Sequence, residues 1–194
     1  RGNKISTQQY ATNGRAQYGE VFRYNKDNLE IFHAGTNYRG DTTYREYKKW
    51  KGNLQIESKY VYQNNYSNNK TTFEYDGKGR KIRQVTENQY NNTEVSYTYD
   101  DNDNVILTTQ KLTYNNASYN NQVTITKTSF ESDLPTKNTY YSNNQNYRQN
   151  TYYTYRGDDL IEVREMNGGA YVSSTKFEEF ATSGLKIEYK HNYQ

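Results

Sequence analysis

Two stretches of the chain decide its fold: Phe73-Glu74-Tyr75-Asp76-Gly77-Lys78-Gly79-Arg80-Lys81-Ile82 and Tyr97-Thr98-Tyr99-Asp100-Asp101-Asn102-Asp103-Asn104-Val105-Ile106. In each stretch, aromatic residues alternate with polar ones, a short run rich in Asp, Asn or Gly follows, and aliphatic residues come next. Alternation with a period of two indicates a β-strand. Asn and Gly accept a positive φ and Asp bonds its own backbone, so the middle run indicates a tight turn. The unit is therefore predicted to be strand, turn, strand.

The same unit recurs along the whole chain with looser sequence. The aromatic residues that precede each turn are Tyr24, Tyr47, Tyr75, Tyr99, Phe130, Tyr155 and Phe180. Seven hairpins predict about 14 antiparallel strands, and strand twist makes open sheets of more than about 10 strands curl, split or close. We expect an all-β protein: one domain over residues 1–194, built as an antiparallel meander in a single curled or barrel-like sheet.

The composition limits the class of protein. The 194 residues include 24 Tyr and no Cys, so rings take the place of an aliphatic core, and disulfides and thiolate metal sites are excluded. No run of about 18 apolar residues predicts a transmembrane helix. Polar residues alternate with Tyr, whereas a lipid-spanning barrel would need an aliphatic outer band. The net charge is +3 and the charges are scattered, which indicates solvated strand faces, and no nucleic acid is expected as a partner.

The strand-turn-strand unit resembles the YD-repeat family of Rhs-type cell-surface repeats, whose unit reads roughly Tyr-x-Tyr-Asp-x-x-Gly-Arg-aliphatic. Residues 73–82 match with Phe73 in place of the first Tyr and with Lys81 inserted before the aliphatic residue. Residues 97–105 keep Tyr-x-Tyr-Asp and carry Asp103-Asn104 in place of Gly-Arg. The Tyr- and Asn-rich, Cys-free chain is also similar to short secreted or lipid-anchored proteins of Bacteroidetes. The resemblance implies a cell-envelope protein and brings no catalytic motif.

Candidate catalytic and metal-binding motifs have simpler explanations. Residues 100–104 offer oxygens like the start of a calcium loop, but Val105 stands where that loop needs Gly and Lys111 where it needs Glu. Residues 77–80 have no following helix to bind a phosphate. Both segments are therefore interpreted as hairpin turns. His33 and His191 show no ligand spacing and are predicted to lie at the surface, with His33 at a return turn.

Two pairs of adjacent carboxylates also fail to predict an active site. Neighbouring strand residues point to opposite faces of a sheet, so Glu178-Glu179 cannot converge on one substrate, and Asp158-Asp159 is predicted to lie in a turn. A glycosidase needs two carboxyl groups that face each other across a cleft. We therefore predict no catalytic residues, no metal and no cofactor, and favour a non-catalytic protein over an enzyme.

The function that the sequence favours is binding through Tyr- and Asn-rich surfaces, with a polysaccharide or another envelope protein as the partner. Aromatic and amide side chains can stack on sugar rings and bond their hydroxyl groups. Two alternatives stay open: a hydrolase acting on polysaccharide, and a subunit that pairs through the open edges of its sheet. The expected location is extracytoplasmic, which means the periplasm, the outer-membrane surface or the medium, with outer-membrane association through a removed N-terminal anchor. The predicted binding residues are Trp50, Tyr47, Tyr66, Tyr119 and Tyr147.

Overall fold

A computed structural model describes residues 4–11, 13–63, 68–143, 147–168, 170–179 and 186–192. These residues form strands, turns and bends, and they contain no helix that could cross a membrane. The strands are β1 (Lys4–Tyr10), β2 (Ala16–Tyr24), β3 (Glu30–Thr36), β4 (Thr42–Lys51), β5 (Leu54–Tyr62), β6 (Asn69–Tyr75), β7 (Lys81–Asn88), β8 (Asn91–Tyr99), β9 (Val105–Tyr114), β10 (Gln122–Glu131), β11 (Leu134–Ser142), β12 (Tyr147–Arg156), β13 (Asp159–Asn167), β14 (Ala170–Glu179) and β15 (Lys186–Asn192).

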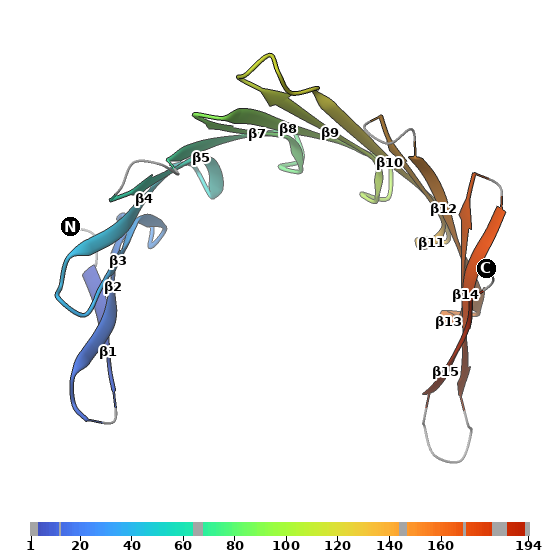
Figure 1. Cartoon of the computed structure of the whole chain (residues 1–194), viewed down its shortest axis with the longest axis horizontal. Coiled ribbons are helices and arrows are strands. Elements are labelled where there is room, and N and C mark those ends of the chain that lie inside the picture. The colour runs from blue at the N-terminus through green and yellow to red at the C-terminus, as the bar shows by residue number, and fades with distance from the viewer. Residues whose placement is uncertain are drawn as a thin grey trace. The chain divides into compact units, whose positions relative to one another are not determined.

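The strand order confirms the all-β meander. All strands belong to one sheet, and their order in the sheet is their order in the chain, from β1 to β15 (Figure 1). The sheet is not closed, so β1 and β15 each have a single neighbour. The predicted hairpins are β2–β3, β4–β5, β6–β7, β8–β9, β10–β11, β12–β13 and β14–β15. Among the described strands, β1 lies outside the seven predicted hairpins; it pairs with β2 alone, although it too ends in an aromatic residue, Tyr10.

The chain groups into two compact units. Unit 1 consists of residues 1–94 and 113–119, and unit 2 consists of residues 95–112 and 120–194. The single domain over residues 1–194 stays a prediction.

The turns of the two best repeats have one geometry, and it explains their acidic residues. The Oδ1 atom of Asp100 accepts hydrogen bonds from the backbone N–H groups of Asn102 and Asn104, at 3.0 and 2.8 Å. Asp76 does the same for Lys78 and Arg80, both at 2.9 Å. The carboxylate oxygens therefore serve the backbone, which confirms that these segments are hairpin turns.

The fourth residue of each of these turns has a left-handed backbone conformation. Gly79 has a φ of 82° and Asp103 a φ of 69°. A type I turn that ends in such a residue is a common three-residue hairpin connection. Gly suits the position because it has no Cβ, and Asp tolerates it better than most other residues do. The turns of β4–β5 and β10–β11 are shorter, with two residues each, and both Ser132 and Asp133 have a positive φ.

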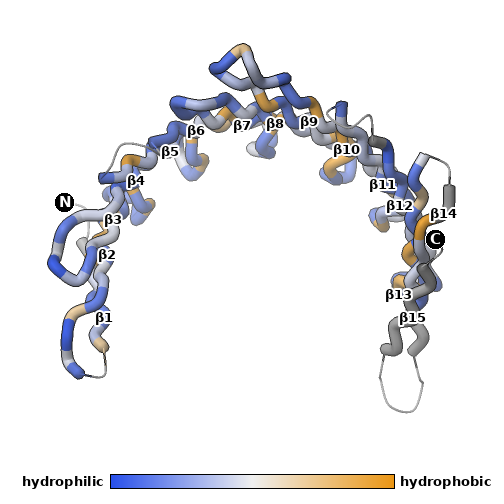
Figure 2. Tube along the Cα trace, in the orientation of Figure 1, coloured by the Kyte–Doolittle hydropathy of each residue, from blue (hydrophilic) through white to orange (hydrophobic). Residues whose placement is uncertain are grey.

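The sheet has almost no enclosed core. Among the described residues, Ala34 is the one buried hydrophobic side chain, and most strand residues are half-buried. Figure 2 shows hydrophobic segments alternating with hydrophilic ones along the strands. Many tyrosines expose more than a third of their surface, and Tyr10, Tyr18, Tyr38, Tyr47, Tyr90 and Tyr119 expose the most. The other described tyrosines are half-buried, as expected of rings that take the place of an aliphatic core, and any function of the described residues has to lie on a sheet face, an edge or a turn.

Candidate binding site

Strands β2–β5 of unit 1 carry two chemically different faces. Directly paired residues of antiparallel strands share a face, and neighbours along a strand point to opposite faces. The pairs Arg23↔Phe32, Phe32↔Tyr47 and Tyr47↔Lys59 therefore lie on one face, which we name the Tyr47 face. The pairs Phe22↔His33, His33↔Glu46 and Glu46↔Tyr60 lie on the other face, which we name the His33 face.

Aromatic rings follow one another across the His33 face. The ring of Phe22 stacks on His33 with centroids 4.4 Å apart, and Tyr44 meets His33 edge-on at 5.3 Å. Tyr44 stacks in turn on Tyr60 at 5.2 Å, and Tyr60 contacts Tyr62 at 5.1 Å. Aromatic pairs at these separations contribute about 0.5–1.5 kcal/mol each beyond the area they bury. The ladder therefore holds β2, β3, β4 and β5 together without a second layer.

Gly35 provides the space that the ladder needs. Gly35 is paired directly with Tyr44, and a Cβ atom at Gly35 would lie 2.9 Å from Cζ and 3.0 Å from Cδ1 of the Tyr44 ring. The ring can therefore reach across β3 towards His33 only because residue 35 has no side chain. An aromatic residue that covers a glycine on the neighbouring strand is a known way to stabilise glycine in a sheet.

The charged groups of the His33 face neutralise one another. The Lys48 Nζ atom lies 2.7 Å from Glu30 Oε1 and 3.4 Å from Glu46 Oε2. Burial lowers the pKa of Lys48, but its bonds to these carboxylates outweigh that effect and leave the pKa above its usual value. His33 Nε2 lies 3.0 Å from the Tyr44 hydroxyl oxygen and 3.4 Å from Glu20 Oε1.

These groups resemble a metal site by composition, but a lysine already occupies the cation position. Potential ligand atoms of Glu30, His33 and Glu46 all lie within 4.8 Å of one another. Lys48 bonds both carboxylates, so a divalent ion could bind only by displacing its ammonium group. Burial also raises the pKa of Tyr44, and it raises that of Tyr60 to about 12, so both phenols stay protonated at neutral pH. The cluster is therefore built to stabilise the sheet.

The Tyr47 face is basic. On β2–β5 it carries five basic side chains and one acidic one: Arg23, Arg45, Lys49, Lys51, Lys59 and Glu57. The His33 face of the same strands carries the opposite balance, with Glu20, Glu30 and Glu46 against Lys48. The two faces of these four strands therefore differ in sign of charge, although the chain as a whole is nearly neutral.

Tyr47 lies at the centre of the basic face. It exposes 45% of its surface, and its ring packs edge-on against Phe32 with centroids 5.3 Å apart. The guanidinium of Arg23 lies 4.8 Å from the centroid of the Phe32 ring on its other side. Lys59 is paired directly with Tyr47 across β5, and Arg45 precedes Tyr47 by two residues on the same face. One exposed ring is thus surrounded by cationic side chains.

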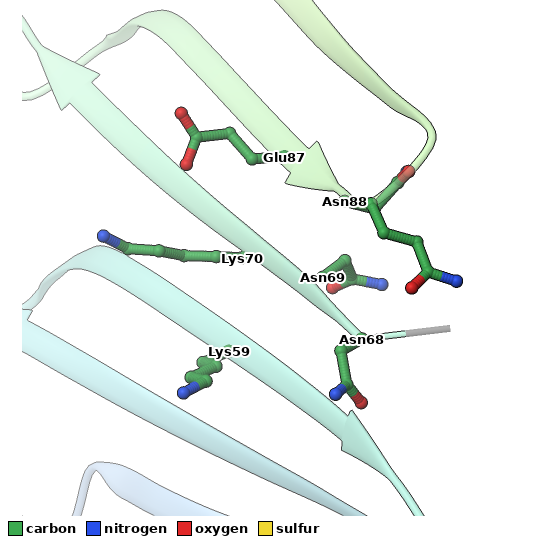
Figure 3. A pocket seen from close by; sticks show the side chains of 7 residues that line it. Lys59, Asn68, Asn69, Lys70, Glu87 and Asn88 are labelled. Atoms are coloured by element: carbon green, nitrogen blue, oxygen red, sulfur yellow. The ribbon is translucent and has the colours of Figure 1, made fainter. Parts of the chain in front are cut away.

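The paired residues Arg23, Phe32, Tyr47 and Lys59 form a row across β2–β5. A polar groove of about 350 Å³ lies at the Lys59 end of this row. Figure 3 shows Lys59, Lys70 and Glu87 beside one another on β5, β6 and β7, in agreement with their direct pairing. Amide side chains complete the lining: Asn68 and Gln89 lie just outside the strands, whereas Asn69 and Asn88 are paired with each other and, through Asn69, with Tyr60 of the His33 face. The groove offers amide donors and acceptors next to ammonium groups, a combination that suits hydroxyl-rich or anionic ligands.

Unit 2 holds a second cavity of about 500 Å³ near the turns of β10–β11 and β12–β13. Its lining includes the carboxylates of Glu131 and Asp158 and the rings of Tyr153 and Tyr155. Both carboxylates are exposed, and neither is bonded to another described side chain. Catalytic carboxylates need a supporting shell that holds them in place. The hydrolase alternative therefore finds no support in the described part of this cavity.

The structure separates the two residues that the sequence placed together. Trp50 and Tyr47 lie on opposite faces of β4, because three positions separate them and the register shift between Lys49 and Trp50 places its extra residue on β5. The Trp50 indole N–H donates a hydrogen bond to the backbone oxygen of Glu30, at 2.7 Å, on the His33 face. Lys48 also belongs to that face, so Lys48 and Lys49, which are neighbours in the sequence, lie on opposite faces.

The other predicted residues fall in different places. Tyr119 exposes 62% of its surface in unit 1 and lies 5.3 Å from the ring of Tyr114. Tyr66 lies outside the described residues, and Tyr147 begins β12 with a side chain that is not described. His33 corrects a prediction, because it lies within β3 rather than at a turn, and its side chain is only 18% exposed. His191 lies in β15, and its side chain is not described.

The sequence did contain the signal for the basic face. Residues 45, 47, 49 and 51 are Arg, Tyr, Lys and Lys, at alternate positions of one strand. A period-two analysis of charge, applied as for hydrophobicity, would have placed them on one face. Lys59 carries no such signal, because only the strand register pairs it with Tyr47.

Comparisons with known proteins leave the family open. No protein-family model and no curated protein sequence matches the chain. Among solved structures, the chain is similar to the crystal structure of TcdB2-TccC3-Cdc42, with 16% identity and a TM-score of 0.33. The match covers 96% of this chain but only 9% of that one. A similarity of this size supports no argument about function.

Proposed function

We propose that this chain is a non-catalytic binding module that holds a polysaccharide on the Tyr47 face. The observation that supports the proposal is the exposure of Tyr47 beside a groove lined by amide side chains. A tyrosine ring can stack on the apolar face of a sugar while neighbouring amides bond the hydroxyl groups. Tyr47, Lys59 and Lys70 stand on paired strands, which hold them in place before a ligand binds, and Asn68 and Gln89 lie just outside the strands.

The different contacts on the two faces favour the Tyr47 face of β2–β5 as the binding surface. On the His33 face, the rings of Phe22, His33, Tyr44 and Tyr60 contact one another, and Glu30 and Glu46 are bonded to Lys48, so the centre of that face is occupied by its own contacts. On the opposite face, Tyr47 contacts Phe32 with one edge only and leaves nearly half of its surface to solvent. Large exposed aromatic residues flanked by polar groups are characteristic of binding surfaces.

The location and the wider assembly belong to the same proposal. An envelope or secreted protein would meet polysaccharide outside the cytoplasm, and the resemblance to YD repeats supports that location. The two stretches that carry the resemblance form β6–β7 and β8–β9 with the same turn geometry. Pairing of β1 or β15 with a strand of another envelope protein remains compatible with binding on the Tyr47 face, because an edge and a face are separate surfaces.

A glycan array followed by calorimetry tests the proposal. Tyr47→Ala is expected to weaken the best glycan about tenfold, which equals about 1.4 kcal/mol. Tyr18→Ala is the matched control, because Tyr18 is 51% exposed but lies on the other face of the same strands. The proposal is wrong if no glycan binds, or if the two variants lose affinity equally.

A further inference from the structure

The charge of the Tyr47 face identifies the class of polysaccharide, provided that the proposed function holds. We propose that the ligand is acidic, with carboxylate or sulfate groups that bind Lys59 and Arg45 on either side of a sugar stacked on Tyr47. Lys59 faces Tyr47 across the strand pair, and Arg45 lies two residues away along β4. In strands these positions lie about 5 and about 7 Å from Tyr47, which is within reach of one or two sugar units.

On the described Tyr47 face of β2–β5, Lys59, Arg45 and Lys51 have no ion pair, side-chain hydrogen bond or ring contact, and of these Lys59 and Arg45 lie nearest to Tyr47 in the strand register. Lys49 and Lys70 both bond Glu57, with Nζ to carboxylate distances of 2.8 and 3.3 Å. The hydrogen bond from Lys49 lowers the pKa of Glu57, and the bond from Lys70 adds to that effect, so the carboxylate stays charged and serves its two lysines. Among the described residues, neither Lys59 nor Arg45 has an ion pair or a side-chain hydrogen bond. An anionic ligand would supply the charge that they lack.

The pairing of Lys59 adds an argument from stability. Lys59 lies directly opposite Lys70, and like charges at directly paired positions destabilise a sheet. Glu57 compensates Lys70 but makes no bond to Lys59. Proteins commonly keep a destabilising residue when that residue is needed for function. Lys59 fits this description, because it destabilises the sheet and bonds no other side chain. An anion bound at Lys59 would relieve the repulsion and stabilise the protein through binding.

The aromatic content of the face distinguishes an acidic polysaccharide from single-stranded nucleic acid. Nucleic-acid grooves stack successive bases on successive aromatic rings. On the described Tyr47 face of β2–β5, Phe32 is half-buried and its ring is covered by Arg23, which leaves Tyr47 as the exposed ring. One ring with amides beside it suits a hydroxylated chain with spaced charges better than a row of bases.

Calorimetric titration with three polymers tests the inference. The probes are polygalacturonate, its fully methyl-esterified form, which has the same sugar without the charge, and oligothymidylate. We expect polygalacturonate to bind at least about tenfold more tightly than the esterified polymer, with an affinity that falls as salt is added. Lys59→Gln and Arg45→Gln should each weaken polygalacturonate about fivefold, whereas Lys26→Gln, in an exposed turn, should change its affinity less than twofold.

Urea unfolding of the same variants separates function from structure. Lys59→Gln removes a repulsion, so its midpoint is expected to equal or exceed that of the unmodified protein while binding is lost. A lowered midpoint would show that Lys59 supports the fold and would overturn the inference. If both galacturonan forms bind equally and depend on Tyr47, the inference fails and the proposed function stands. If neither form nor any arrayed glycan binds, both fail, and tighter binding of oligothymidylate also overturns both.

Discussion

A single methyl group at position 35 should dismantle the aromatic ladder. In the structure, Gly35 lies directly opposite Tyr44, and an added Cβ would lie 2.9 Å from Cζ and 3.0 Å from Cδ1 of its ring, with Cε1 closer still. Distances below 3.0 Å between such atoms are not tolerated, and the obstacle is a ring packed between two neighbours. In Gly35→Ala, the Tyr44 ring therefore has to leave its position against His33 and Tyr60.

The expected cost follows from opposing contributions. Replacing a strand glycine with alanine at an unobstructed site stabilises a protein by about 0.4–1 kcal/mol, because the unfolded chain loses freedom. Overpacking costs about 1–3 kcal/mol, and a lost aromatic pair costs about 0.5–1.5 kcal/mol. We therefore expect Gly35→Ala to lower the free energy of unfolding by about 1–3 kcal/mol, although substitution by alanine is usually favourable in a strand.

Urea unfolding measures this cost, with the fluorescence of the single Trp as the signal. Trp50 is a suitable reporter because it lies on the same face, with its indole N–H bonded to Glu30. Gly77→Ala is the matched control, because a Cβ there meets no atom within 4 Å and Gly77 has no positive φ. The control should be neutral or slightly stabilising.

A double-mutant cycle with Tyr44→Ala isolates the clash. Without the ring, Gly35→Ala should cost nothing, so the two single effects should not add. Additive effects, or a Gly35→Ala protein as stable as the Gly77→Ala control, would refute the reasoning. Either result would mean that the Tyr44 ring does not need the space above Gly35.

Two further predictions concern the His33 face. Burial and the neighbouring Tyr44, Tyr62 and Glu46 raise the pKa of Tyr60 from 10.0 to about 12, so ultraviolet titration should show a late phenol that is absent in Tyr60→Phe. Since the unfolded chain releases this proton first, stability should fall from about pH 10 to about pH 12, and titration of every phenol near pH 10 would contradict the assignment. Lys48→Ala should destabilise the protein by leaving Glu30 and Glu46 close together, and zinc should raise the urea midpoint of this variant but not of the unmodified protein. If zinc does not change the urea midpoint of Lys48→Ala, then Glu30, Glu46 and His33 cannot bind an ion together.

Local sequence signals were sufficient to predict the hairpins. The Asp76 and Asp100 turns depend on residues within five positions of one another, and their side chains bond the backbone of the same turn. The strand on each side alternates with a period of two. Because the chain then visits its strands in order, local units were enough to give the topology of the sheet.

The candidate site depends on register, which the sequence does not reveal by itself. Trp50 and Tyr47 are both predicted binding residues, and they are close along the chain on either side of Lys48 and Lys49. The strand places them on opposite sides, and the indole N–H of Trp50 bonds the backbone of Glu30, twenty positions away. Likewise, only the strand register places Lys59 directly opposite Tyr47 and Lys70. Such pairings join residues that no short window of sequence contains.

A single-layer sheet can separate stability from binding because its two faces are independent. In a two-layer protein, one face of each sheet is consumed by the core. In β2–β5, the His33 face does the work of a core with stacked rings and a neutralised charge cluster, while remaining thin and partly wet. The Tyr47 face therefore does not have to form a core, and it can keep unpaired cationic side chains that would be too costly to bury. Substitutions on the two faces should therefore differ in kind: those on the His33 face should lower the urea midpoint, and those of Lys59 and Arg45 should lower affinity without lowering the midpoint.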